Sequence, residues 1–123
     1  MGKRIMIIED DIVELNRLSL LLDLKGFDVC PLNHSYRFLT EVIKCNPDLI
    51  LLDSMLAEID SNLIAHTLKS SDAVRNIPLV LIAGKDHENY TYAYKSSGNG
   101  NLEDIKTSDI YSLINDIELK MAS

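Results

Sequence analysis

Apolar residues occur along the chain in short continuous runs, separated by segments in which apolar positions recur at helical spacing. The runs lack the apolar–polar alternation of a half-exposed strand, so they predict strands buried on both faces. Pro31 is expected to end the second of them. The expected strands are Arg4–Ile8, Phe27–Cys30, Asp48–Asp53 and Pro78–Ala83, with a weaker fifth strand within Gly100–Asp104.

Between these runs, apolar residues at three- and four-residue spacing predict helices with one buried face. Asp10 or Asp11 can cap the first helix, and Gly26 can terminate it. Ser35 is expected to begin the second helix and Asn46-Pro47 to end it. The remaining expected helices are Asn62–Ser70, a segment after Glu88 that ends at Ser97, and a C-terminal segment capped by Ser108 or Asp109.

The segment Tyr90–Tyr94 gives conflicting signals. Aromatic and small residues alternate in it, and a period of two is typical of a strand. Its place between two expected strands favours a helix, because strands and helices alternate in the rest of the chain. We expect a helix, which completes five strand–helix pairs. This alternation predicts an α/β fold in which helices cover both faces of a parallel sheet.

Composition narrows the class of protein. The length of 123 residues suits one domain, and 46% apolar with 25% charged residues is typical of soluble domains. No apolar run approaches the ~20 residues of a membrane span, and the four apolar residues after Lys3-Arg4 are too few for a signal peptide, so we expect a cytoplasmic protein.

The net charge of −7 disfavours direct binding to nucleic acid or anionic membranes. Cys30 and Cys45 form no disulfide framework or metal motif.

Acidic residues follow two expected strands at their carboxyl ends, where ligand sites of open parallel sheets lie. Glu9, Asp10 and Asp11 follow the first strand, and Asp53 ends the third. Like charges held this close repel unless a cation lies among them, and Mg²⁺ prefers such oxygen ligands. Helix capping explains Asp10 or Asp11, but it does not explain Asp53. Glu9, Asp10 and Asp53 are therefore the predicted magnesium ligands, in a pocket suited to phosphoryl chemistry.

Two motifs, IMIIEDD at Ile5–Asp11 and NPDLILLDSML at Asn46–Leu56, resemble those of response-regulator receiver domains. The resemblance extends over about Lys3 to Leu119. It implies one receiver domain over residues 1–123, with the flavodoxin-like, doubly wound (βα)5 fold. The implied sheet has five parallel strands in the order 2-1-3-4-5, with helices on both faces.

The resemblance also implies the roles of individual residues. Asp53 corresponds to the phosphoryl acceptor and Lys106 to the lysine of the family's site. Mg²⁺ would be held by Glu9, Asp10, Asp53 and the backbone carbonyl of Met55. Such a stand-alone receiver works in a phosphorelay and is no enzyme beyond its own phosphoryl transfer and hydrolysis. The implied partners are a sensor histidine kinase or histidine phosphotransfer protein and a downstream protein target, without direct contact to nucleic acid or membrane; a weak homodimer is compatible with it.

Other positions depart from the family pattern. Ala57 and Glu58 stand where a Pro and a Gly are usual, and Ala83 lacks the Ser or Thr hydroxyl that binds a phosphoryl oxygen. Leu102 or a neighbour replaces the switching aromatic residue, and Thr107 replaces a Pro. These departures leave open an alternative, in which a degenerate receiver acts as a phosphorylation-independent protein-binding module.

A third interpretation is an enzyme. Phosphatases with an Asp-x-Asp motif also form an aspartyl phosphate, but Met55 occupies the position of the second Asp, which argues against this class.

Overall fold

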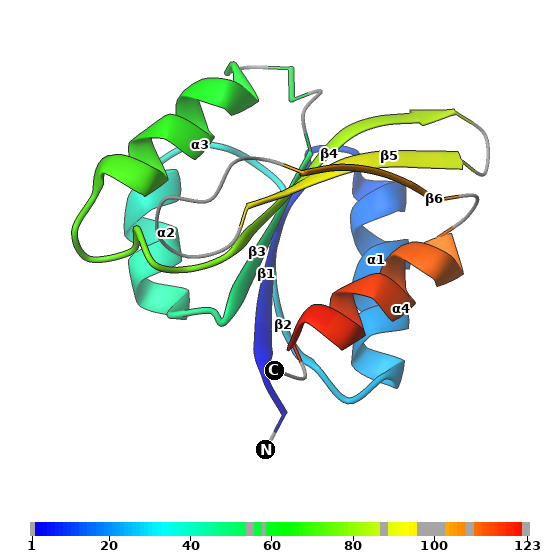
Figure 1. The fold of residues 1–123 in the computed structure, drawn as a ribbon. Helices are drawn as coiled ribbons and strands as arrows, with labels where there is room; N and C mark the ends of the chain where they lie inside the picture. The colour runs from blue at the N-terminus through cyan, green and yellow to red at the C-terminus, as the bar shows by residue number, and fades with distance from the viewer. Residues whose placement is uncertain are drawn as a thin grey trace.

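A computed structural model describes residues 2–53, 56–57, 59–86, 89–95, 103–107 and 110–121, and within residues 83–110 it describes the backbone alone. Six strands form one sheet in the order β2-β1-β3-β4-β5-β6 (Figure 1). The strands are β1 (Arg4–Ile8), β2 (Asp28–Leu32), β3 (Leu49–Asp53), β4 (Leu79–Asp86), β5 (Asn89–Lys95) and β6 (Glu103–Thr107). The helices are α1 (Ile12–Leu24), α2 (Phe38–Cys45), α3 (Ser61–Ser70) and α4 (Ile110–Met121).

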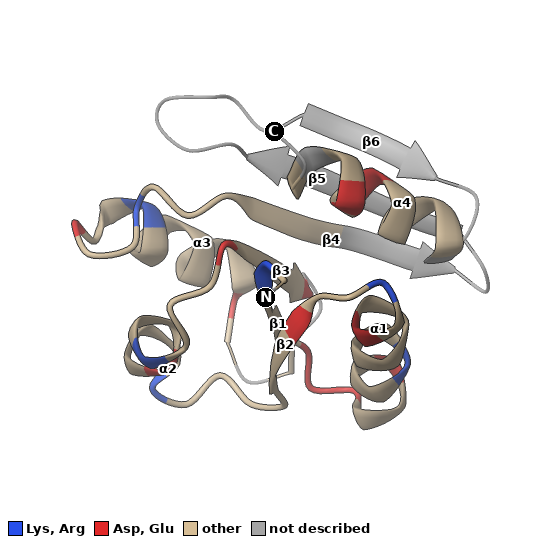
Figure 2. Cartoon of the chain, turned by 90° about the horizontal axis from the view of Figure 1, so that it is seen from below, with Lys and Arg blue, Asp and Glu red and all other residues tan. Residues whose placement is uncertain are grey.

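Strands β1 to β4 are parallel to their neighbours, with β1 between β2 and β3. Helices α1 and α4 cover one face of the sheet, and α2 and α3 cover the other (Figure 1). The expected α/β, flavodoxin-like arrangement of this part, with strand order 2-1-3-4, is confirmed. Acidic residues lie on both α1 and α4, together with basic residues on α1 (Figure 2). In the part of the chain that the structure describes, no helix is long and apolar enough to cross a membrane.

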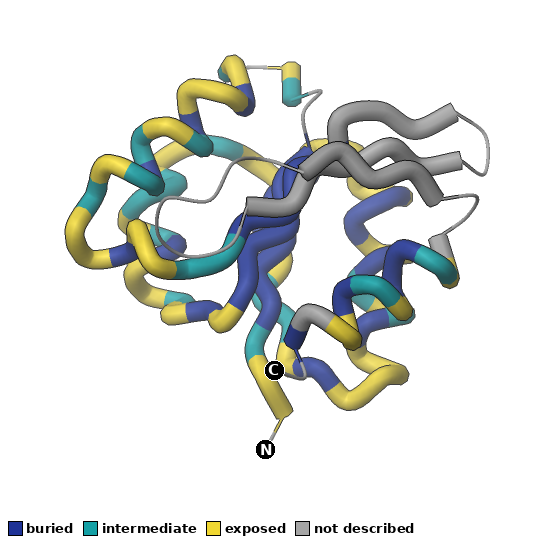
Figure 3. Tube along the Cα trace, viewed as in Figure 1, coloured by how far each residue is buried: buried dark blue, intermediate teal, exposed yellow. Residues whose placement is uncertain are grey.

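Alternate residues of the buried strands form two separate cores. Strand β3 is buried throughout, and β1 is buried from Ile5 onwards (Figure 3). This arrangement explains the continuous apolar runs, because both faces of each inner strand pack on helices. The core under α1 and α4 contains Ile5, Ile7, Leu49, Leu51, Val80 and Ile82 from the sheet. The core under α2 and α3 contains Met6, Ile8, Ile50, Leu52, Leu79 and Leu81.

The second half of the sheet differs from expectation. The segment predicted as a helix after Glu88 is strand β5, which pairs antiparallel with β4, and β6 pairs antiparallel with β5. The expected five-stranded, all-parallel sheet is therefore wrong here, although β6 again runs in the direction of β4. The physical reason is the period of two in Tyr90–Tyr94, since alternating aromatic and small residues suit a pleated strand. The predicted stop at Gly98 lies outside the described residues.

Two element boundaries also moved. Pro31 lies within β2 rather than ending it, because β2 is an edge strand and the amide donor that proline lacks is not needed on the open side. Helix α2 begins at Phe38 rather than Ser35, after a turn in which the Phe38 amide donates to the Ser35 carbonyl at 3.2 Å. At the end of α1, Gly26 has a φ of 92°, which explains its use as the terminator.

Candidate acidic site at the carboxyl edge of the sheet

The register of two central strands brings Glu9 and Asp53 together. Ile8 of β1 pairs with Leu52 of β3, so Glu9 and Asp53 follow side by side at the carboxyl edge. Both side chains are buried, with Glu9 1% and Asp53 4% exposed. The Glu9 amide donates to the Leu32 carbonyl at 3.0 Å, which ties this corner to β2.

Asp10 and Asp11 have separate tasks. Asp11 is the N-cap of α1, and its Oδ1 accepts from the amides of Val13 at 3.0 Å and Glu14 at 3.3 Å. Glu9 Oε1 accepts from the Asp11 amide at 3.0 Å, which orients the Glu9 carboxylate. Asp10 therefore does not cap the helix, and its side chain is exposed beside Glu9. The sequence allowed either Asp10 or Asp11 to cap α1, and in the structure Asp11 is the cap.

Glu9, Asp10 and Asp53 each offer a carboxylate oxygen, and these oxygens lie within 4.8 Å of one another. Oxygens on opposite sides of an octahedral Mg²⁺ are about 4.2 Å apart, given ligand distances of about 2.1 Å. Separations within this limit allow the three carboxylates to share one Mg²⁺, and water can fill its remaining positions. Without a cation, three carboxylates at this spacing repel one another.

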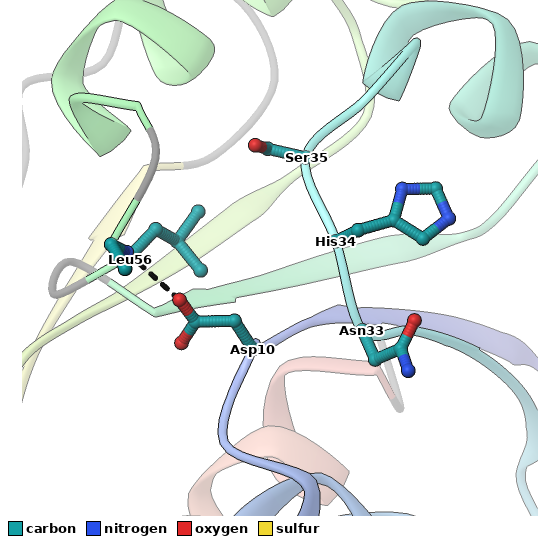
Figure 4. A pocket seen from close by; sticks show the side chains of 6 residues that line it. Asp10, Asn33, His34, Ser35 and Leu56 are labelled. Atoms are coloured by element: carbon teal, nitrogen blue, oxygen red, sulfur yellow. Dashed lines mark hydrogen bonds between the residues drawn. The ribbon is translucent and has the colours of Figure 1, made fainter.

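A small cavity of about 80 Å³ adjoins the cluster on the side of the segment between β2 and α2. It is lined by Asp10, Asn33, His34, Ser35, Leu56 and Ala57. Figure 4 shows the Asp10 carboxylate pointing across it towards the segment after β3, while the Ser35 hydroxyl points into it from the opposite wall. A hydrogen bond of 2.8 Å joins the Ala57 amide to Asp10 Oδ2. Sequence reasoning missed this contact, although Ala57 in place of a usual Pro was the available signal.

Helix α3 anchors the backbone of Asp53. The Ser61 hydroxyl donates to the Asp53 carbonyl at 2.6 Å, in a buried contact. Asp60 caps α3 by accepting from the Asn62 amide at 2.9 Å, so the helix starts at a fixed place behind the acceptor strand. The contact between Ser61 and Asp53 was not predicted from the sequence.

The structure places the backbone of Lys106 away from the cluster. Lys106 lies on β6 opposite Thr91, and the sheet order puts β4 and β5 between it and Asp53. Three strand spacings amount to about 14 Å, so the backbone of Lys106 is remote from the carboxylates. Ala83 lies at an irregularity of β4, where the pairing register shifts between Ile82 and Gly84. Met55 and Leu102 lie outside the described residues.

At the opposite edge of the sheet, Arg4 links three elements. Its Nε donates to Asp28 Oδ2 at 2.8 Å and its Nη1 donates to the Cys45 carbonyl at 2.7 Å. The hydrogen bond and charge of Asp28 raise the pKa of Arg4. Burial, together with a hydrogen bond to Cys30, raises the pKa of the Cys45 thiol to about 12. The thiols of this corner are thus structural neighbours packed against the core under α2 and α3.

The chain matches no protein-family model. It is 31% identical over 85 residues to the DNA-binding response regulator MtrA of Mycobacterium tuberculosis, a match that covers 69% of this chain and 36% of MtrA. It is 26% identical over 87 residues to the phosphate regulon transcriptional regulatory protein PhoB of Pseudomonas aeruginosa, covering 71% of this chain and 38% of PhoB. The chain therefore spans little more than a third of the length of these relatives.

Solved structures show the same similarity. The signal receiver domain of a DNA-binding response regulator from Colwellia psychrerythraea 34H has a TM-score of 0.63 and 25% identity, covering 70% of this chain and 72% of that one. The N-terminal domain of a response regulator receiver protein from Methanoculleus marisnigri JR1 has a TM-score of 0.64 at 23% identity, covering 68% of each chain, and supports the fold. With its parallel core, the chain belongs to the receiver domains of response regulators.

Proposed function

We propose that this receiver accepts a phosphoryl group on Asp53 from a phosphohistidine of a sensor histidine kinase or a phosphotransfer protein. The observation that carries the proposal is the convergence of Glu9, Asp10 and Asp53 within 4.8 Å at the carboxyl edge of the sheet. All three groups carry the same charge, so their convergence favours a cation at this edge of the sheet. A site that receives phosphoryl groups does need such a set, since it has to hold a divalent cation beside the acceptor.

In the proposed transfer, an Asp53 carboxylate oxygen forms a bond to phosphorus while the phosphorus–nitrogen bond of the phosphohistidine breaks. The electron pair of that bond leaves with the imidazole, which takes up a proton. The protein takes part in little covalent chemistry, so positioning and charge neutralisation account for most of the acceleration of the transfer. Bound Mg²⁺ would supply the neutralisation, held by Glu9, Asp10, Asp53 and the backbone carbonyl of Met55.

The chain's other contacts serve positioning. Asp11 fixes the start of α1 and holds the Glu9 carboxylate through its amide. Ser61 holds the carbonyl of Asp53, and Asp60 fixes the start of α3. These contacts reduce the freedom of the acidic residues before the donor arrives, which lowers the entropic cost of reaching a reactive geometry.

The wider setting follows from this assignment. We infer a signalling domain that catalyses only its own phosphoryl transfer and hydrolysis, works in the cytoplasm and passes its state to a downstream protein. MtrA is named as DNA-binding, but the chain covers 36% of it, and its own net charge of −7 favours protein partners over direct nucleic-acid contact. The intact acidic cluster disfavours the alternative of a degenerate binding module.

The test is incubation of the chain with a small phosphodonor such as phosphoramidate and Mg²⁺, followed by intact mass measurement. We expect addition of one phosphoryl group to the wild type and none to Asp53→Asn. Asp60→Asn is the matched control, because asparagine also caps a helix and Asp60 lies outside the cluster. Equal labelling of wild type and Asp53→Asn would place the acceptor elsewhere.

A further inference from the structure

The contact between Asp10 and Ala57 joins two segments that are 47 residues apart in the chain. Asp10 follows β1, and Ala57 lies between β3 and α3. The Ala57 amide donates to Asp10 Oδ2 at 2.8 Å, which is the length of a good charge-assisted hydrogen bond. The dashed line in Figure 4 marks this contact at the wall of the cavity.

The contact depends on the residue type at position 57. Alanine has a backbone N–H, whereas proline, which the family usually carries there, has none. The hydrogen bond is therefore available to this chain because of a departure in its own sequence. The acceptor is Asp10, which is the exposed residue of the acidic cluster.

The Ala57 amide and a bound cation would thus compete for the Asp10 carboxylate. An Asp10 oxygen that accepts from Ala57 has one lone pair less for a cation, and its position is set by the segment after β3. A cation that draws the Asp10 carboxylate towards Glu9 and Asp53 would lengthen the contact with Ala57. Conversely, the hydrogen bond from Ala57 should lower the affinity of the site for Mg²⁺, because coupling between two binding events is reciprocal.

We propose that the Asp10–Ala57 hydrogen bond is a latch, which ties Ala57 to the end of β1 in the metal-free chain and breaks when Mg²⁺ binds. The proposal rests on the function proposed above, since it takes Asp10 as a magnesium ligand. Its consequence is that the segment next to the acceptor responds to metal before any phosphoryl transfer. The signal would thus begin beside Asp53 and need no hydroxyl at position 83.

The direct test follows the Ala57 amide of the isotope-labelled full chain by nuclear magnetic resonance during a titration with MgCl₂. We expect the hydrogen-exchange rate of this amide to rise about threefold to tenfold at saturation, as expected when a net-favourable hydrogen bond is lost. An Ala57 amide that stays equally protected while Asp10 and Asp53 signals shift would overturn the latch and leave the metal site standing. No shift at any of the three acidic residues would overturn both the latch and the magnesium site.

Two variants test the competition independently. Ala57→Pro removes the donor and Ala57→Gly retains it. We expect calorimetry to show Mg²⁺ binding about threefold to tenfold tighter in Ala57→Pro than in Ala57→Gly. Equal or weaker binding in folded Ala57→Pro would overturn the latch. If circular dichroism shows that Ala57→Pro does not fold, the amide titration of the wild type decides.

Discussion

The Ser61 hydroxyl donates a hydrogen bond of 2.6 Å to the backbone carbonyl of Asp53, so the first turn of α3 holds the end of the acceptor strand. Both residues are buried, with Ser61 2% exposed. Water therefore cannot readily replace this donor. The position of the acceptor carboxylate depends on a serine eight residues further along the chain.

Ser61→Ala is expected to destabilise the protein by about 1–3 kcal/mol, the cost of removing a buried hydrogen-bond donor. The measurement is urea unfolding followed by circular dichroism. Ser70→Ala is the matched control, because the Ser70 hydroxyl also donates to a carbonyl, that of His66 at 2.8 Å, but in an exposed place. A control that loses as much stability as Ser61→Ala would show that burial of the Asp53 contact is unimportant.

Asp10→Asn is expected to weaken Mg²⁺ binding at least about tenfold and to stabilise the metal-free protein by up to about 1 kcal/mol. The first effect removes a charged ligand, and the second removes repulsion among three carboxylates. Calorimetry and urea unfolding measure the two effects. Asp11→Asn changes the charge equally while keeping a capping side chain, so it should leave the affinity nearly unchanged. Equal affinity in wild type and Asp10→Asn would contradict the assignment.

The Cys45 thiol should resist alkylation in the folded chain. Burial raises its pKa to about 12, and only the thiolate reacts with iodoacetamide. At pH 8.5 we expect alkylation of Cys45 to be at least about a hundredfold slower in the folded chain than in urea. Mass mapping of the labelled peptide gives the rate, and fast labelling of folded Cys45 would contradict the raised pKa.

The same shift makes stability depend on pH. The folded chain favours the protonated thiol, so its contribution to stability is present below the ordinary cysteine pKa and is lost as the pH rises towards about 12. The urea midpoint of the wild type should fall more steeply above pH 9 than that of Cys45→Ala.

The pairing of β5 with β6 can be tested by cross-linking. Ala93 lies opposite Asp104 in the register of these strands. With Cys30 and Cys45 replaced by alanine, we expect Ala93→Cys with Asp104→Cys to form a disulfide on mild oxidation. Ala93→Cys with Thr107→Cys is the control, because three positions out of register are about 10 Å. Failure of the first pair, with the folded state intact, would favour the helix expected from the order of elements.

Lys106→Ala is expected to leave the rate of Asp53 phosphorylation within about twofold of wild type, since three strand spacings of about 4.8 Å separate β3 from β6. The measurement is the time course of the mass increase with a small phosphodonor. Lys106→Arg serves as the control for loss of charge at this edge. A large loss in Lys106→Ala alone would mean that Lys106 takes part in the transfer, as the family resemblance implied.

The parallel core could be predicted because its causes are local and strong. Continuous apolar runs indicate burial on both faces, and once β1 and β3 pair, their carboxyl ends place Glu9 beside Asp53. In the segment Tyr90–Tyr94, residue period and position in the fold disagreed, and the period prevailed. The position of Lys106 away from Asp53 has the same origin, because β5 lies between β4 and β6. Contacts such as Asp10 with Ala57 depend on loop conformation, which has no periodic signal.

Pro31 on the outer strand β2 has a consequence for self-association. An open strand edge offers a row of amide donors on which a second chain can align and grow into an aggregate. The pyrrolidine ring of Pro31 interrupts that row at the fourth of the five residues of β2, and the exposed Asp28 adds charge at its start. This border of the sheet is thereby protected against intermolecular strand addition.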